Sequence, residues 1–163
     1  MKATKHPHRP KSMSHSDLPI LQSNARSHQL ARHGWPETIS LDGPSSGVAL
    51  LFGAPQTSRI VPIYLANATG SLLIDVFVSD AGFINFDETH EDTRPHVRAL
   101  ETIESGTGSF LDAYLLDLAG DFLVSYSVIA TTEQGVRYYG SAPISRPPHD
   151  GWIAIEDWAP IRA

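Results

Sequence analysis

Apolar and polar residues change their pattern along this chain near residue 38. Beyond it, short runs rich in Val, Ile, Leu, Phe and Tyr are separated by clusters of Gly, Pro, Asn, Asp and Ser, which is typical of β-strands joined by turns. The runs predict nine strands, which are Thr38–Leu41, Val48–Gly53, Arg59–Asn67, Leu72–Asp80, Val97–Ile103, Ser109–Leu116, Asp121–Thr132, Val136–Ala142 and Ile153–Trp158. No helical pattern separates these runs, so the sequence favours an all-β fold.

Two stretches alternate most clearly. Residues 59–80 contain two alternating runs joined by a tight connection at residues 68–71, which predicts an antiparallel hairpin. Pro62 has no N–H to donate, so its strand should lie at a sheet edge or carry a bulge there. Residues 121–142 alternate with a period of two around a turn at residues 133–135. A helix cannot reproduce that period, so a second hairpin is predicted.

The strand pattern predicts an antiparallel β-sandwich, immunoglobulin-like by architecture, over residues 36–163. The chain has 163 residues, which is the size of one domain with a tail. It contains no cysteine, which excludes disulfides, thiolate metal sites and cysteine nucleophiles. No apolar run approaches the roughly 20 residues of a membrane-spanning helix, so no membrane partner is expected.

Residues 1–35 differ in composition and are expected to form a disordered basic arm rich in His and Pro. A short helix is compatible with residues 18–33, with Gly34 in position to end it. Residues 1–33 carry a net charge of +5 and residues 34–163 a net charge of −11. The arm either keeps the acidic body soluble or contacts an acidic partner. Because the body is negatively charged, nucleic acid would be bound only through the arm.

The N-terminal stretch lacks the apolar core of an export signal. Its charged start is followed only by Leu18-Pro-Ile-Leu21, whereas a secretory signal needs an apolar run of about 7–15 residues. The stretch is acid-poor and contains serines, which is also compatible with a mitochondrial leader, but Pro7, Pro10 and Pro19 oppose a leader helix. We therefore expect a cytoplasmic protein.

Residues 81–96 are interpreted as a connection longer than the roughly 4–6 residues usual between elements. Carboxylates and imidazoles are concentrated at residues 87–96, and both are ligand types for divalent cations. Their spacing matches no established metal motif, so a solvated acidic loop is favoured over a metal site. The candidate ligands are His90, Glu91, Asp92 and His96.

No catalytic frame is recognisable in the sequence. It has no Gly-x-Ser-x-Gly elbow and no dinucleotide fingerprint. The glycine-rich residues 105–109 are not followed by the lysine of a phosphate-binding loop, so a turn explains them better. The sequence favours a protein that is not an enzyme and needs no cofactor.

The C-terminal segment 151–163 is unusually apolar for a chain end. Its alternation fits a final strand that closes a sheet, and it also fits an anchor that docks on a neighbouring protein. The residues expected to contact a partner in the second case are Trp152, Ile153, Ile155 and Trp158.

These observations favour a non-enzymatic protein-binding or assembly module. Its partner would be another protein or a second copy, contacted through a sheet edge, the 81–96 loop or the tryptophan-bearing end. One alternative is a metal-dependent enzyme that uses residues 87–96. The other is a nucleic-acid-associated factor that uses the basic arm.

Overall fold

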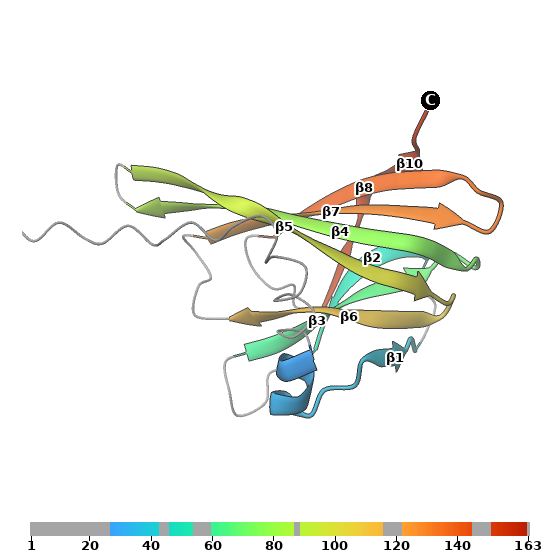
Figure 1. Ribbon diagram of the computed structural model, residues 1–163, viewed down its shortest axis with the longest axis horizontal. Helices are drawn as coiled ribbons and strands as arrows, with labels where there is room; N and C mark the ends of the chain where they lie inside the picture. Colours follow the sequence, from blue (N-terminus) through green and yellow to red (C-terminus); the bar gives the residue numbers. More distant parts are fainter. Residues whose placement is uncertain are drawn as a thin grey trace, which may run out of the picture.

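Two layers of antiparallel strands make up most of this chain (Figure 1). The structure is a computed structural model that describes residues 27–42, 46–53, 60–86, 89–115, 122–144 and 151–162, with the backbone alone at 81–86, 89–96, 115 and 122–123. The predicted β-sandwich is therefore confirmed. No helix in the described part of the chain is long and apolar enough to cross a membrane.

Each layer is a sheet of five strands. The first sheet has the order β1-β6-β3-β2-β9 and the second has the order β10-β8-β7-β4-β5. The strands are β1 (Thr38–Ser40), β2 (Gly47–Phe52), β3 (Ile60–Ala68), β4 (Leu73–Phe86), β5 (Thr89–Ile103), β6 (Thr107–Leu115), β7 (Phe122–Thr132), β8 (Arg137–Ile144), β9 (Trp152–Ala154) and β10 (Glu156–Pro160). All the pairings are antiparallel. The hairpin predicted over residues 121–142 is confirmed as β7 and β8.

The core lies between the sheets and contains the apolar set that alternation predicts. On β7 the inward positions Tyr126, Val128 and Ala130 are each no more than 2% exposed, and Val76 and Val78 of β4 are fully buried. Burying an aliphatic side chain of this size contributes about 1.5–3 kcal/mol relative to leaving it exposed. The alternating apolar side chains that the two sheets bury between them therefore hold the layers together.

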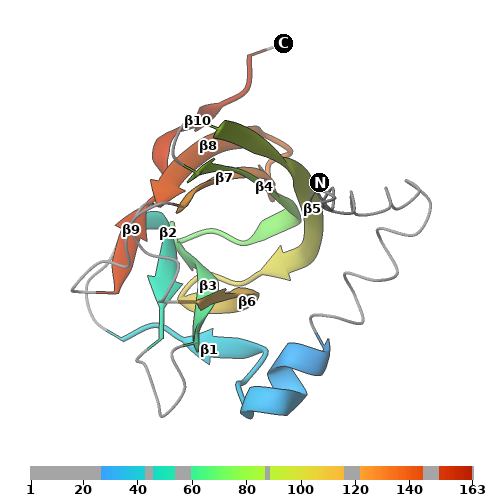
Figure 2. The same ribbon diagram turned by 90° about the vertical axis from the view of Figure 1, so that its left-hand side faces the viewer.

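One side of the sandwich is closed by the C-terminal segment, as Figure 2 shows at β9 and β10. The predicted single strand 153–158 is instead two strands in different sheets, because the chain changes sheets at Ile155, which is buried in the core. Gly140 of β8 permits this crossing. A Cβ at that position would lie 2.5 Å from the Ile155 side chain and 2.8 Å from the Glu156 carbonyl oxygen.

The hairpin predicted over residues 59–80 is wrong, because β3 and β4 belong to different sheets. Residues 69–72 carry the chain across the sandwich, and alternation alone does not distinguish such an arch from a hairpin turn. Pro62 lies on an interior strand and not at an edge. The other expectation, a bulge at Pro62, agrees better with the structure, since the register of β3 against β6 shifts between Ile63 and Tyr64.

The long connection predicted at 81–96 is also wrong. β4 extends to Phe86 and β5 begins at Thr89, so both sides of this stretch are paired strands. Polar and charged residues there concealed the strand pattern, because a hairpin that extends beyond the core needs no apolar face. Residues 87 and 88 lie outside the described part of the chain.

The outer face of the first sheet is covered by the segment that precedes β1. Residues 27–33 form a helix, and Gly34 ends it at φ 66°, with the Trp35 N–H bonded to the Leu30 carbonyl. Trp35 then packs on Phe110 of β6, with ring centroids 5.8 Å apart, and the Tyr64 hydroxyl donates to the Pro36 carbonyl at 2.7 Å. The helix end predicted at Gly34 is confirmed, while residues 18–26, like the rest of the predicted arm before them, lie outside the described part.

Trp35→Ala should lower the free energy of unfolding by about 2 kcal/mol. Trp→Ala changes in a core cost about 3–5 kcal/mol. We expect a smaller loss here because Trp35 is only partly buried. Urea unfolding of the full chain measures this loss. The control is Tyr139→Ala, which removes a ring that is 43% exposed on the other sheet and should cost less than about 1 kcal/mol. Equal losses in the two variants would show that Trp35 does not anchor the segment.

Candidate functional site

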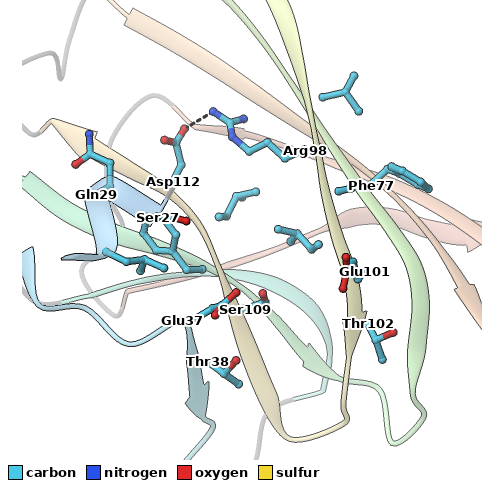
Figure 3. A pocket seen from close by; sticks show the side chains of 16 residues that line it. Ser27, Gln29, Glu37, Thr38, Phe77, Arg98, Glu101, Thr102, Ser109 and Asp112 are labelled. Atoms are coloured by element: carbon cyan, nitrogen blue, oxygen red, sulfur yellow. Dashed lines mark hydrogen bonds and ion pairs between the residues drawn. The ribbon is translucent and has the colours of Figure 1, made fainter. Parts of the chain in front are cut away.

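A groove runs along the side of the sandwich opposite the crossing at Ile155. Figure 3 shows side chains that line it. Its volume is about 930 Å³, and its walls are formed by β5, by β6 with β1, and by the helix at residues 27–33. Its size lies within the roughly 300–1,000 Å³ of typical ligand pockets. β1 has only three residues and pairs with β6 at residues 107–109, next to the part of β6 that lines the groove.

A bulge in β6 turns a carboxylate into the space between the sheets. Ile63 pairs with Asp112 and Tyr64 pairs with Phe110, which leaves Leu111 as the extra residue. Leu111 is buried in the core, and the next residue, Asp112, bonds side chains of the opposite sheet. Both consecutive residues therefore face inward, which strict alternation would not allow.

Arg98 of β5 joins the two sheets at this point. Its Nη2 lies 3.0 Å from Asp112 Oδ2 on β6, and its Nη1 lies 2.8 Å from Asp80 Oδ2 on β4. The Tyr126 hydroxyl donates to the same Asp112 oxygen at 3.1 Å, and the Ala113 N–H donates to Oδ1 at 2.8 Å. Figure 3 shows Arg98 and Asp112 meeting across the groove. We call Arg98, Asp80, Asp112 and Tyr126 the inter-sheet cluster.

Burial governs the protonation of this cluster. Burial raises the pKa of Asp112, while Arg98, the Ala113 N–H and the Tyr126 hydroxyl oppose that rise. Burial alone would lower the pKa of Arg98, but the carboxylates of Asp112 and Asp80 more than offset it and raise the pKa. Burial and then the Asp112 charge raise the pKa of Tyr126, so its hydroxyl remains a donor. The cluster can therefore fix the position of β5 against β6.

The edge of the second sheet at the groove is β5, which pairs only with β4 among the residues that the structure describes. Its register is regular over residues 96–99 and shifts beyond both ends of that stretch. Near the register shift between the pairs Val76–Glu101 and Phe77–Ala99, the backbone of Asp75 and of Glu101 is left-handed, with φ 47° and 59°. Figure 2 shows β5 curving from its own sheet toward β6. The regular stretch at residues 96–99 is therefore short, and it is separated by a register shift from a second regular stretch at residues 89–93.

Exposed apolar side chains lie along this edge, where they also line the groove. Val97 is 57% exposed and Phe77 is 43% exposed. Phe77 pairs with Ala99 and Ser79 pairs with Val97, so Phe77 and Val97 are diagonal neighbours on adjacent strands. We call Val97, Ala99 and Phe77 the edge patch.

The metal-ligand candidates all have their backbone on β5. His90 pairs with Asn85, Glu91 with Ile84, Asp92 with Phe83, and His96 with Asp80. Their side chains lie outside what the structure describes, so the metal prediction stays a prediction. In the described part of the chain, no group of three or more His, Asp or Glu side chains could hold a metal ion.

The C-terminal candidates lie on the closed side, away from the groove. Ile155 is 6% exposed within the core, and Ile153 and Trp158 pack against it. Trp158 also stacks on Tyr138, with ring centroids 5.5 Å apart, and Trp152 pairs with Leu51 at the β9 edge. The backbone of this segment closes both sheets, as the strand interpretation expected. Partner binding by its tryptophans stays a prediction.

The sequence analysis did not identify the inter-sheet cluster. Asp112 interrupts an apolar run, in FLDAYL, and an acid at an expected strand position is the one signal that could have marked it. Asp80 and Arg98 lie 18 residues apart in sequence and meet only because β4 and β5 pair.

No protein-family model matches the chain, and the search of curated proteins gave no match. Among solved structures, the E. coli curli protein CsgC aligns with a TM-score of 0.36 and 11% identity, over 58% of this chain and 97% of that one. A C2 domain of the Drosophila protein RIM aligns with a TM-score of 0.32 and 16% identity, over 73% of this chain and 100% of that domain. Likenesses at this level carry no argument about function, and the chain is assigned to the all-β sandwich class by its own two sheets.

Proposed function

We propose that this protein is a non-enzymatic protein-binding module that takes up a short extended segment of a partner at the β5 edge. The supporting observation is that β5, the outermost strand of its sheet, faces a groove on the open side of the sandwich. An extended segment can add to such an edge through main-chain hydrogen bonds, with side chains on alternate sides supplying specificity.

The shape of the edge supports a short partner segment. Register shifts bound the regular stretch at residues 96–99, and bulges of this kind protect an edge from open-ended pairing. The edge patch offers exposed apolar area next to the side of β5 on which no described strand pairs. A partner strand would therefore gain apolar contacts with the edge patch, whose residues also line the groove.

Val97→Asp should reduce partner retention about tenfold without unfolding the chain. A carboxylate at this 57% exposed position would replace apolar contact area with a charge at the edge, and a tenfold loss corresponds to about 1.4 kcal/mol. The measurement is the yield of proteins captured from the native host's extract by the immobilised full chain. Hydrogen exchange of the complex should show protection at residues 96–99.

Val136→Asp is the matched control, because Val136 is 40% exposed beside the β7–β8 turn and far along the sheet order from β5. Its captured yield should equal that of the unsubstituted chain. The proposal fails if both variants retain the same proteins in the same amounts, or if no specific protein is captured.

A further inference from the structure

We propose that the outer face of the second sheet is a docking surface for a second copy of this chain. Among the residues that the structure describes, every exposed large apolar side chain lies on a strand of this sheet or directly beside one; these are Phe77, Val97, Val136, Tyr139 and Ile161. The first sheet differs, because the helix at residues 27–33 and Trp35 cover its outer face. Figures 1 and 2 show this helix on the far side of the molecule from β7 and β8.

Strand register places three outward residues of the second sheet in one row. Phe77 of β4 pairs with Ile129 of β7, and Ile129 pairs with Tyr139 of β8. The sequence neighbours of Phe77 and of Ile129 are fully buried in the core, so these two side chains point away from it. Phe77 and Tyr139 are each 43% exposed. Because the outer face of an antiparallel sheet is normally polar, an apolar row across three strands indicates a contact surface.

The neighbouring row on the same three strands consists of serines. Ser79 pairs with Ser127, and Ser127 pairs with Ser141. The Tyr139 hydroxyl lies 3.4 Å from Ser127 Oγ, which places the two rows on the same face. Neither row contains a charged residue on these strands. Charge is found at the margin, where Glu156 pairs with Ser141 at the β10 edge.

An uncharged face of this kind is complementary to itself. In a two-fold contact, residues near the axis meet their own counterparts, so a charge there would meet the same charge. Apolar rings pack on one another, and a hydroxyl both donates and accepts, so a serine can bond to the same serine of another copy. Residues 34–163 carry a net charge of −11, so two copies approach with least repulsion through a face whose rows are uncharged. These properties favour a second copy as the occupant.

The size of the face sets the strength of the contact. Strands lie about 4.8 Å apart and outward residues about 6.8 Å apart along a strand, so five strands and three rows cover up to about 500 Å². The third row contains Ser125 and Pro143, which pair with each other. A standard interface buries about 800 Å² on each partner. We therefore expect a weak dimer, populated at about 100 μM and dissociated at about 1 μM.

The test is analytical ultracentrifugation of the full chain at these two concentrations. The average mass should be near 17.8 kDa at the lower concentration and should rise towards twice that value at the higher one. Tyr139→Asp should weaken the dimer at least about tenfold, because two carboxylates would be brought together in place of two rings. A chain that stays monomeric at the higher concentration would overturn the inference. A Tyr139→Asp variant that dimerises like the unsubstituted chain would do the same.

Ser40→Asp is the control for the added charge. Ser40 is exposed on β1 of the first sheet, so the substitution adds the same charge away from the proposed face. This variant should dimerise as the unsubstituted chain does. Equal weakening by Ser40→Asp and Tyr139→Asp would show that overall charge, and not this face, controls association, and would contradict the inference.

Cross-linking identifies the face that makes the contact. The chain contains no cysteine, so Ser127→Cys and Ser40→Cys each carry a single thiol. A bis-maleimide that spans about 10 Å, the spacing of stacked sheets, should join two copies of Ser127→Cys and leave Ser40→Cys unjoined. The reverse result would place the contact on another surface and overturn the inference.

This inference does not rest on the proposed function, and the two can fail separately. β7 and β4 lie between β8 and β5, so Tyr139→Asp should leave the capture of host proteins at the β5 edge unchanged. If the dimer forms and no host protein is captured, the proposed function is wrong and the docking face stands. If host proteins are captured through Val97 and the chain remains monomeric, the docking face is wrong and the proposed function stands.

Discussion

Replacing Arg98 with methionine is expected to lower the free energy of unfolding by about 2–3 kcal/mol at pH 7. The substitution leaves two carboxylates, Asp80 and Asp112, without their shared cation between the sheets. Removing one partner of a fully buried ion pair costs about 3–5 kcal/mol. We expect a smaller loss than for a fully buried pair, because the side chains of Arg98, Asp80 and Asp112 keep 19%, 15% and 31% of their surface exposed. Urea unfolding measures the loss.

The loss should depend on pH in a defined direction. Burial already raises the pKa of Asp112 in the folded chain, and without Arg98 this carboxyl group would hold its proton to higher pH. A carboxyl whose folded pKa is raised favours the folded state below its unfolded value of about 3.9, and that contribution is lost as pH rises. The difference between Arg98→Met and the unsubstituted chain should therefore be small near pH 3–4 and largest at neutral pH.

Arg137→Met is the control for the loss of a positive charge. Arg137 is exposed on β8, so its replacement should change stability by less than about 0.5 kcal/mol at either pH. A loss for Arg98→Met that is the same at both pH values would mean that packing of the arginine stem, and not its charge, stabilises the cluster.

Asn67→Ala is expected to cost about 3 kcal/mol. Asn67 is fully buried at the end of β3, where its amide donates to the carbonyls of Ser71 at 2.8 Å and Ile103 at 2.9 Å. Its Oδ1 accepts hydrogen bonds from the N–H and hydroxyl of Thr69. Each buried group left without a partner costs about 1–3 kcal/mol, and the groups at Thr69 and Ser71 can partly recover bonds with water. Thermal or urea unfolding measures this loss.

The size of that effect follows from where Asn67 lies. The arch from β3 to β4 and the turn from β5 to β6 both pass between the sheets at this end, and the Gly106 N–H bonds the Asn67 carbonyl at 2.8 Å. Ser105→Ala tests a neighbouring contact, since Ser105 Oγ accepts from the Gly70 N–H at an exposed site. It should cost less than about 1 kcal/mol. Equal losses for the two variants would contradict a special role for the buried amide.

Both of these sites bear on the proposed edge. Arg98 fixes the regular stretch of β5 against β6, and the Asn67 amide bonds the Ile103 carbonyl at the far end of the same strand. A strand that is attached at these two points is presented to a partner in a fixed position, which reduces the entropy lost on binding. Stability and binding at β5 should therefore be measured together.

The sequence predicted the strands well because burial on a sheet has a period of two. Val76 and Val78 on β4, like Tyr126 and Val128 on β7, are inward in both the pattern and the structure. Prediction was poor where strands leave the core, as in residues 81–96, because pairing there depends on backbone bonds that any side chain permits. The immunoglobulin-like assignment and the cytoplasmic location stay predictions.

By itself, the sequence determined the parts of the strands that lie in the core, their inward faces and the helix end at Gly34, since each follows from local alternation or from glycine's access to positive φ. Only the tertiary structure decided which strands pair, and therefore that residues 69–72 form an arch and that β5 borders a groove. It also decided the meeting of Arg98 with Asp112, because a single bulge at Leu111 reverses the facing of every later residue on β6. The only local sign of this register shift is an acid within an apolar run, and such a residue does not by itself reveal a bulge, although the candidate site depends on one.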